Sequence, residues 1–176
     1  MEMLTPRLRV LVADDHAPTR MALRGDLENA GIEVCAEAAT GVQAIDAALS
    51  TRPDVCLVDI RMPDGDGIAA TEAIRRELPS TKVVLITATP DEEGAVAAAR
   101  AGADGYLDKY VDTRRLPEVV KAVAAGQAAY PRRLMRGLLR AVRQANLSAQ
   151  RPEHPLTLQS GIDGNKLFTS NFPKSG

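Results

Sequence analysis

Cysteine and the aromatic residues are scarce in this chain, and long apolar runs are missing. Of its 176 residues two are Cys, none is Trp and two are Phe. The two thiols, Cys35 and Cys56, lack a Cys-x-x-Cys spacing and a nearby His, which argues against structural zinc, a redox motif and a disulfide framework. Without an apolar run of about eighteen residues or a signal-peptide layout, the sequence predicts a cytoplasmic globular protein that stays out of the membrane.

Acidic residues are missing from one segment near the end. Residues 131–151 hold six Arg and no acid, whereas residues 1–130 hold 21 acids and 14 bases. The first part is therefore not expected to bind nucleic acid by itself. Residues 152–176 contain no Arg, both Phe residues and no sustained periodicity, so residues 151–176 are interpreted as a tail and not as a domain.

Five apolar runs alternate with five helical patterns in the first part of the chain. The expected strands are 8–13, 32–36, 54–58, 82–86 and 104–108, and each is followed by apolar residues at helical spacing. Such alternation, with strands apolar on both faces, predicts an α/β fold of the flavodoxin-like type: a doubly wound parallel sheet in the order 2-1-3-4-5 with helices on both faces. This domain is expected to span residues 1–130, followed by a basic amphipathic linker helix over residues 131–150.

Polar residues follow four of the five expected strands. They are Asp14 and Asp15 after the first, Asp59 after the third, Thr87 after the fourth and Lys109 after the fifth. In the predicted order these strands are neighbours, so their carboxyl ends bring the five side chains to one edge of the sheet.

Three carboxylates at one place repel each other and favour a hard divalent cation, for which Mg²⁺ is the natural candidate. Since Mg²⁺ takes only one or two carboxylates directly, Asp59 is left able to attack a phosphorus atom. Lys109 and the Thr87 hydroxyl could then share the phosphoryl oxygens. The pattern therefore predicts an aspartyl-phosphate site.

The stretches VLVADDH, LVDIRMPDGDG, VVLITA and AGADGYLDK resemble the four signature stretches of receiver domains in bacterial two-component response regulators, over residues 7–130. The resemblance implies a CheY-like fold and a signalling switch that is not an enzyme, phosphorylated by a sensor histidine kinase. It assigns Asp59 as the phosphoacceptor and Lys109 as the phosphate-binding lysine. The Mg²⁺ ligands that it implies are Asp14, Asp15, Asp59 and the backbone carbonyl of Arg61. The switch residues that it implies are Thr87 and Tyr106. On phosphorylation Thr87 is expected to move toward the phosphoryl group and Tyr106 to move inward.

The stretch LPEVVKAVAAGQAAYPRRLMRGLL further resembles the end of receivers in NarL/FixJ (LuxR-type) transcription factors. Two positions depart from the family pattern: Tyr110 replaces a frequent proline, and Asp108 puts a charge beside Lys109 where an apolar residue is usual. Members of this branch continue into a helix-turn-helix domain, for which the residues after Thr157 are too few. We therefore interpret the chain as a truncated or frameshifted product with a vector-derived tail, and expect DNA contacts only through the missing C-terminal domain.

Several alternatives stay open at this point. The chain could be a stand-alone receiver in a phosphorelay, or an aspartate-nucleophile phosphatase, although such enzymes need an acid where Arg61 stands. Tyr106 could be a packing residue without a role in switching. Gly67 is interpreted as a turn residue and Asp66 as a loop residue. The apolar face of the linker helix should pack on its own receiver, on a second copy or on the tail, and we favour a homodimer.

Overall fold

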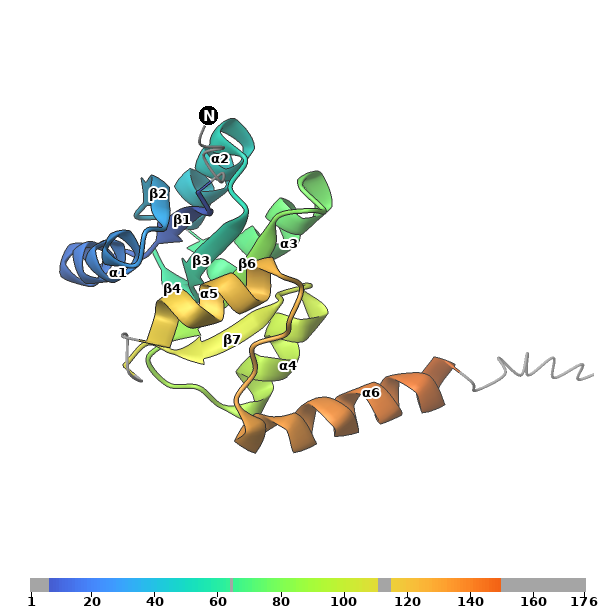
Figure 1. Ribbon diagram of the computed structural model, residues 1–176. Coiled ribbons are helices and arrows are strands. Elements are labelled where there is room, and N and C mark those ends of the chain that lie inside the picture. Colours follow the sequence, from blue (N-terminus) through green and yellow to red (C-terminus); the bar gives the residue numbers. More distant parts are fainter. Residues whose placement is uncertain (1–6, 64, 111–114, 150–176) are drawn as a thin grey trace, which may run out of the picture.

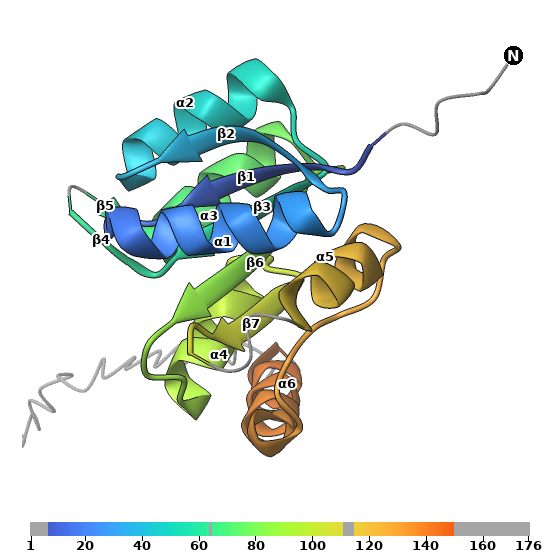
Figure 2. The ribbon, with the colours of Figure 1, turned by 60° about the vertical axis from the view of Figure 1, so that its left-hand side comes forward.

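A five-stranded parallel sheet forms the centre of the molecule (Figures 1 and 2). The computed structural model describes residues 7–63, 65–110 and 115–149, and the expected tail over residues 151–176 lies outside this part. The strands are β1 (Arg9–Ala13), β2 (Glu33–Ala38), β3 (Val55–Asp59), β6 (Lys82–Thr87) and β7 (Gly105–Asp108). Their order, β2-β1-β3-β6-β7, confirms the order predicted from the sequence.

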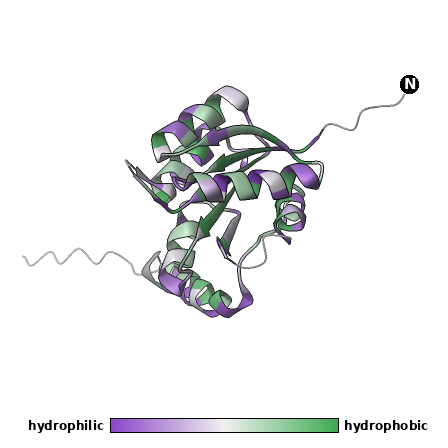
Figure 3. Ribbon diagram, turned by 90° about the vertical axis from the view of Figure 1, so that its left-hand side faces the viewer, coloured by the Kyte–Doolittle hydropathy of each residue, from purple (hydrophilic) through white to green (hydrophobic). Residues whose placement is uncertain are grey.

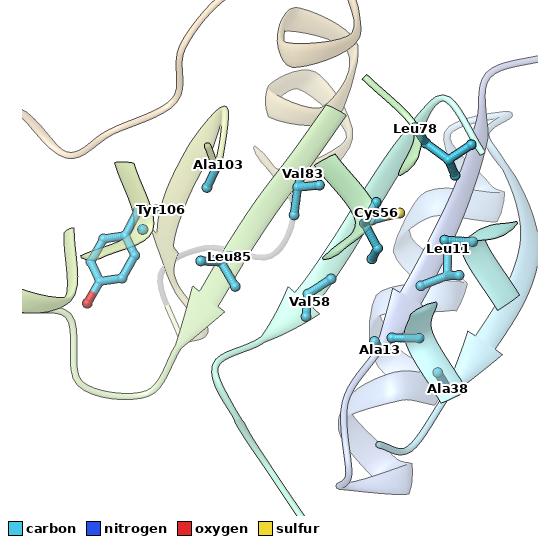
Figure 4. Close-up of a cluster of buried hydrophobic side chains, with 14 of the residues drawn as sticks. Leu11, Ala13, Ala38, Cys56, Val58, Leu78, Val83, Leu85, Ala103 and Tyr106 are labelled. Atoms are coloured by element: carbon cyan, nitrogen blue, oxygen red, sulfur yellow. The ribbon is translucent and has the colours of Figure 1, made fainter. Parts of the chain in front are cut away.

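Helices cover both faces of the sheet, as expected. They are α1 (Ala17–Asn29), α2 (Gly41–Thr51), α3 (Gly67–Glu77), α4 (Glu92–Arg100) and α5 (Leu116–Ala124). Alternate strand residues enter two buried clusters, one against α2, α3 and α4 and the other against α1 and α5. Figure 4 shows the first cluster, and Figure 3 shows the strands as predominantly hydrophobic. Burial on both faces explains why these strands read as unbroken apolar runs.

Side chains at the helix starts fix where the loops end. Thr40 and Asp91 accept hydrogen bonds from the first-turn amides of α2 and α4, and Pro117 lies in the first turn of α5, where its missing N–H does no harm. Asp66 also caps a helix, since its carboxylate accepts from Ile68 N at 2.9 Å. The interpretation of Asp66 as a plain loop charge was therefore wrong.

A short antiparallel hairpin lies between β3 and α3. It pairs β4 (Arg61–Met62) with β5 (Gly65–Asp66). Two-residue strands carry no readable periodicity, so the sequence did not predict them. The hairpin nonetheless matters for the site, because it fixes the backbone that directly follows Asp59.

The two cysteines are free, as predicted. β1 separates their strands, with Leu11 paired to Ala36 on one side and to Cys56 on the other. Burial raises the pKa of the Cys56 thiol to about 12. Cys35 is only half-buried, because it lies on the edge strand β2.

The chain after α5 returns along the edge strand and then leaves the domain. Tyr106 N donates to Ala129 O at 2.8 Å, and Gly105 and Ala129 form a parallel bridge. A single 3-10 turn, η2 (Arg132–Leu134), leads into α6 (Met135–Ala149), which projects from the body in Figure 1. None of the helices in the described ranges combines the length and hydropathy needed to span a bilayer.

The first residue of α3 predicts a sharp difference between two glycine substitutions. A Cβ on Gly67 would overlap the carbonyl oxygen of Asp59 and lie 2.9 Å from Ile60 Cα, so Gly67→Ala must displace backbone. We expect a loss of about 1–3 kcal/mol in the free energy of unfolding, the usual penalty of overpacking. Gly25, inside α1, has nothing within 4 Å of a built Cβ, and Gly25→Ala should stabilise by about 0.5–1 kcal/mol.

Urea unfolding of both variants checks this expectation. Equal stability of Gly67→Ala and the unchanged chain would show that the close approach of α3 to β3 is not a packing constraint.

Candidate functional site

Three carboxylates meet at the carboxyl ends of the central strands. Asp14 and Asp15 follow β1, and Asp59 is the last residue of β3. One oxygen of each lies within 4.8 Å of the others. Asp14 and Asp59 are 0% and 4% exposed, whereas Asp15 is open to solvent. The structure therefore brings together the acidic residues that the sequence predicted to converge, with two of them removed from water.

A single ammonium group lies between the two buried carboxylates. Lys109, which follows β7, places Nζ 2.6 Å from Asp14 Oδ2 and 2.9 Å from Asp59 Oδ2. The side chain of Lys109 is itself only 8% exposed. One positive charge faces two buried negative charges and the nearby Asp15, so the cluster retains a net negative charge.

Asp14 is held firmly but keeps one oxygen without a good hydrogen bond. Its Oδ1 accepts from His16 N at 2.9 Å, and its backbone carbonyl accepts from the Arg20 guanidinium at 2.6 Å. Its Oδ2 is buried and has no aligned hydrogen bond within the described residues, although Lys109 lies beside it as an ion-pair partner. A buried carboxylate oxygen in this condition, next to two further carboxylates, suits a hard cation.

Asp59 is oriented by the backbone that follows it. Its Oδ1 accepts from Arg61 N at 3.3 Å, and Gly67 N donates to Ile60 O at 2.9 Å, which ties the loop to the start of α3. Arg61 and Asp15 line one surface hollow together with Asp66. This hollow gives the acidic cluster an open side.

The remaining predicted residues lie on the neighbouring strands. Thr87 ends β6 and is buried; its Oγ1 accepts from Thr89 N at 3.3 Å, and its carbonyl accepts from Lys109 N at 2.8 Å. No hydrogen bond joins Thr87 to Asp59 in the part of the chain that the structure describes. The pairing of β3 with β6 nonetheless places Thr87 beside the acidic cluster, because Asp59 is paired with Ile86, the residue before Thr87.

Tyr106 is already inside the molecule. It is 1% exposed, and its ring belongs to the buried cluster of Figure 4 with Leu85 and Ala103. Its hydroxyl accepts from Asp91 N at 3.3 Å, at the start of α4, and burial raises its pKa. A Cβ on Gly94 would overlap this hydroxyl. This contact of Gly94 was not predicted from the sequence. The one feature that could have indicated it is the presence of a glycine in the first turn of an alanine-rich helix.

The two departures from the family pattern lie beside the site without blocking it. Asp108 Oδ1 accepts from Tyr110 N at 2.9 Å, and Tyr110 is 75% exposed. Asp108 forms no ion pair with Lys109 among the described residues.

Burial and charge act in opposite directions on the two central groups. Burial raises the pKa of the Asp59 carboxyl, and the hydrogen bond and charge of Lys109 only partly oppose this effect. Burial alone would lower the pKa of Lys109, but its interactions with Asp14 and Asp59 together raise it. Lys109 is therefore a fixed positive charge, whereas the ionised form of Asp59 is disfavoured relative to water.

This geometry defines a class of protein, and the comparison with known families agrees with it. Residues 10–121 match the family model of the response regulator receiver domain. The chain belongs to this family: it holds a receiver domain of the two-component response regulator type, with the flavodoxin-like, CheY-like fold that the sequence predicted.

Individual relatives are response regulators, one of them of the LuxR family. The response regulator protein VraR of Staphylococcus aureus is 32% identical over 124 residues, which cover 70% of this chain and 59% of VraR. A LuxR-family two-component response regulator from Aurantimonas sp. SI85-9A1 superposes with a TM-score of 0.71 at 29% identity, covering 78% of this chain and 99% of that one. The isolated receiver domain of RcsB from Salmonella enterica serovar Typhimurium, solved with the phosphomimetic BeF3-, gives 0.67 at 25% identity, covering 76% and 99%.

The raised pKa of Asp59 predicts that removing its charge stabilises the domain when no metal is present. Between the ordinary value of 3.8 and the raised value, the folded chain holds a proton that the unfolded chain has lost, so stability falls as pH rises through this window. Asn cannot ionise, and Lys109 keeps Asp14 as its ion-pair partner. Asp59→Asn should therefore melt at a higher temperature than the unchanged chain at pH 7 in a metal chelator.

The gain should shrink as pH is lowered toward the ordinary Asp value. Asp46→Asn, which replaces an exposed carboxylate on α2, provides the matched control and should show no such gain. A lower melting temperature for Asp59→Asn at neutral pH would contradict the assignment.

Proposed function

We propose that Asp59 accepts a phosphoryl group from a phosphohistidine of a sensor histidine kinase and that the chain acts as a signalling switch. The observation that carries this proposal is the buried Asp59 carboxylate, which is paired with Lys109 and clustered with Asp14 and Asp15. The RcsB receiver, a relative of the same fold whose structure was determined in the presence of a phosphomimetic, adds support. The chain spans about 59% of the length of the curated relatives that it matches. The activity of the whole protein is therefore part of what we propose.

The transfer requires one bond to form and one to break. An oxygen of Asp59 attacks the phosphorus, and the bond from phosphorus to the histidine nitrogen of the kinase breaks. Lys109 and the Thr87 hydroxyl then hold phosphoryl oxygens, which stabilises the charge that spreads over them. Asp59 Oδ1 accepts a hydrogen bond from Arg61 N, and Oδ2 accepts one from Lys109 Nζ, so both carboxylate oxygens are oriented before the donor arrives.

Asp14, Asp15 and Asp59 are the residues we assign to bind Mg²⁺, with the backbone carbonyl of Arg61 as a further ligand. The three clustered carboxylates, which share the single Lys109 ammonium, support this choice of a hard cation. When bound, Mg²⁺ would neutralise part of the charge on the phosphoryl oxygens and so let an anionic donor approach an acidic cluster.

The switch is assigned to Thr87 and Tyr106. Movement of the Thr87 hydroxyl toward a phosphoryl group would open space beside the Tyr106 ring. Since Tyr106 is already buried, the expected inward movement would be a shift of its ring within the packed cluster. Its hydroxyl touches the first turn of α4 through Asp91 N, so that turn would respond first.

Control of transcription is the output we assign, through a DNA-binding region outside residues 1–150. We divide those residues into a receiver domain, 1–130, and a linker helix, 131–150, and place the chain in the cytoplasm. The similarity to a LuxR-family response regulator supports this reading. A stand-alone receiver is the second candidate. An aspartate-nucleophile phosphatase is disfavoured, because Arg61 occupies the position of the second acid and the cluster offers no spare proton donor there.

Incubation with a small phosphodonor and Mg²⁺ tests the phosphoacceptor directly. Intact mass should rise by one phosphoryl group in the unchanged chain and in the control Asp46→Asn, and should not rise in Asp59→Asn. Omission of Mg²⁺ should slow the modification at least tenfold, about 1.4 kcal/mol in the barrier. A phosphoryl group on another residue, or equal labelling of Asp59→Asn, would overturn the assignment.

A further inference from the structure

One side of α6 is occupied by the chain's own receiver domain. Leu134 is buried, and Leu138 packs against the same cluster that holds Tyr106. Gly137 allows the close approach of Glu92 from α4, whose carboxylate pairs with Arg140 at 2.7 Å. The first turns of α6 are therefore docked on α4.

A second apolar strip on α6 is left open. Met135, Leu139 and Val142 are 40%, 54% and 58% exposed, and Asn146, also exposed, follows in line. The spacing of these four residues is 4-3-4, the d-a-d-a spacing of a coiled-coil heptad. At 3.6 residues per turn this strip lies about a third of a turn away from the docked side.

We infer that this strip pairs with the same strip of a second copy of the chain, as two parallel α6 helices in register. The strip is continuous with an interface that already fixes α6 as a helix, so pairing orders little additional chain. Figure 1 shows α6 projecting from the body. Because the strip lies about a third of a turn from the docked side, we expect each receiver domain to lie beside the pair and not between the two helices. The inference goes beyond the proposed phosphotransfer and does not depend on it.

The charges beside the strip select the parallel direction. In the heptad register, Arg136 and Arg143 occupy e positions, whereas Leu138 and Ala145 occupy g positions. A parallel pair sets each e position against a g position, so Arg143 meets Leu138 of the second copy. An antiparallel pair would set Arg136 against Arg143, two like charges.

Asn146 selects the register. It occupies an a position, where a single buried Asn favours the arrangement in which it meets its own copy across the interface. A shift of one heptad would put Asn146 against an apolar residue and leave its amide without a partner. Charge and polarity therefore agree on one arrangement of the two helices.

The mass of the full chain in solution, measured by sedimentation without phosphodonor, tests the interface. The unchanged chain should have the mass of two chains, and the double variant Leu139→Glu, Val142→Glu should have the mass of one. Both positions are exposed in the single chain, so the variant should keep its fold, as its circular dichroism can verify. Leu147→Glu is the matched control: Leu147 is 68% exposed on the same helix but off the strip, and this variant should stay dimeric.

The direction of pairing has its own measurement. Val142→Cys in the full chain should form a disulfide between copies under mild oxidation, whereas Leu147→Cys should not, with the unchanged chain reporting any reaction of its native thiols. A monomeric unchanged chain, or a dimer that survives the double glutamate substitution, would overturn the inference. If the chain is monomeric and the thiol of Val142→Cys is shielded from alkylation, residues beyond α6 of the same chain cover the strip. This outcome would also contradict the pairing.

Discussion

The burial of the Lys109 ammonium between the Asp14 and Asp59 carboxylates is the physical constraint that the surrounding fold has to accommodate. Each partner comes from the end of a different strand, so the pair forms only if β1, β3 and β7 end at the same edge of one parallel sheet. Removing such charges from water is expensive, and one ammonium offsets only part of that cost for two carboxylates. The two apolar clusters that flank the sheet supply the stability that makes this arrangement tolerable.

The strand order and the convergence of the site could be predicted from the sequence because both follow from local patterns. Strands buried on both faces read as apolar runs, and a polar residue directly after such a run must lie at the carboxyl edge. Asp14, Asp59 and Lys109 are all found in this way. The predicted roles of the Arg61 carbonyl and of Thr87 stay predictions, since they concern contacts with groups that are not part of the chain.

Other features could not be predicted because they depend on how separate helices and strands pack against each other. The close approach of Gly67 to the Asp59 carbonyl depends on how α3 meets β3, and neither segment carries a sign of it. The same applies to Gly94 against the Tyr106 hydroxyl. Asp66 is different: an Asp directly before a helical pattern is a recognised cap, so that function could have been assigned from the sequence.

The first turn of α4 is where the site and the linker helix meet. Tyr106 contacts it through Asp91 N, and α6 contacts it through Glu92. A displacement of the Tyr106 ring would thus reach α6 through one helical turn. From the sequence, the apolar residues of the linker helix were predicted to form a single face. In the structure some of them pack on the receiver domain and the others form an open strip. The reason is that a helix that packs at one end on α4 can bury only one side.

The most direct measurement of the central electrostatic claim is the thermal stability of the chain across a Mg²⁺ titration. If the cluster holds more negative charge than Lys109 neutralises, bound Mg²⁺ must stabilise the folded state, by about 2.7 kcal/mol at one hundred times its dissociation constant. The melting temperature of the unchanged chain should rise with Mg²⁺, and Asp14→Asn should abolish the rise. A melting temperature that ignores Mg²⁺ in the unchanged chain, or rises equally in Asp14→Asn, would contradict the claim that these buried carboxylates form a cation site.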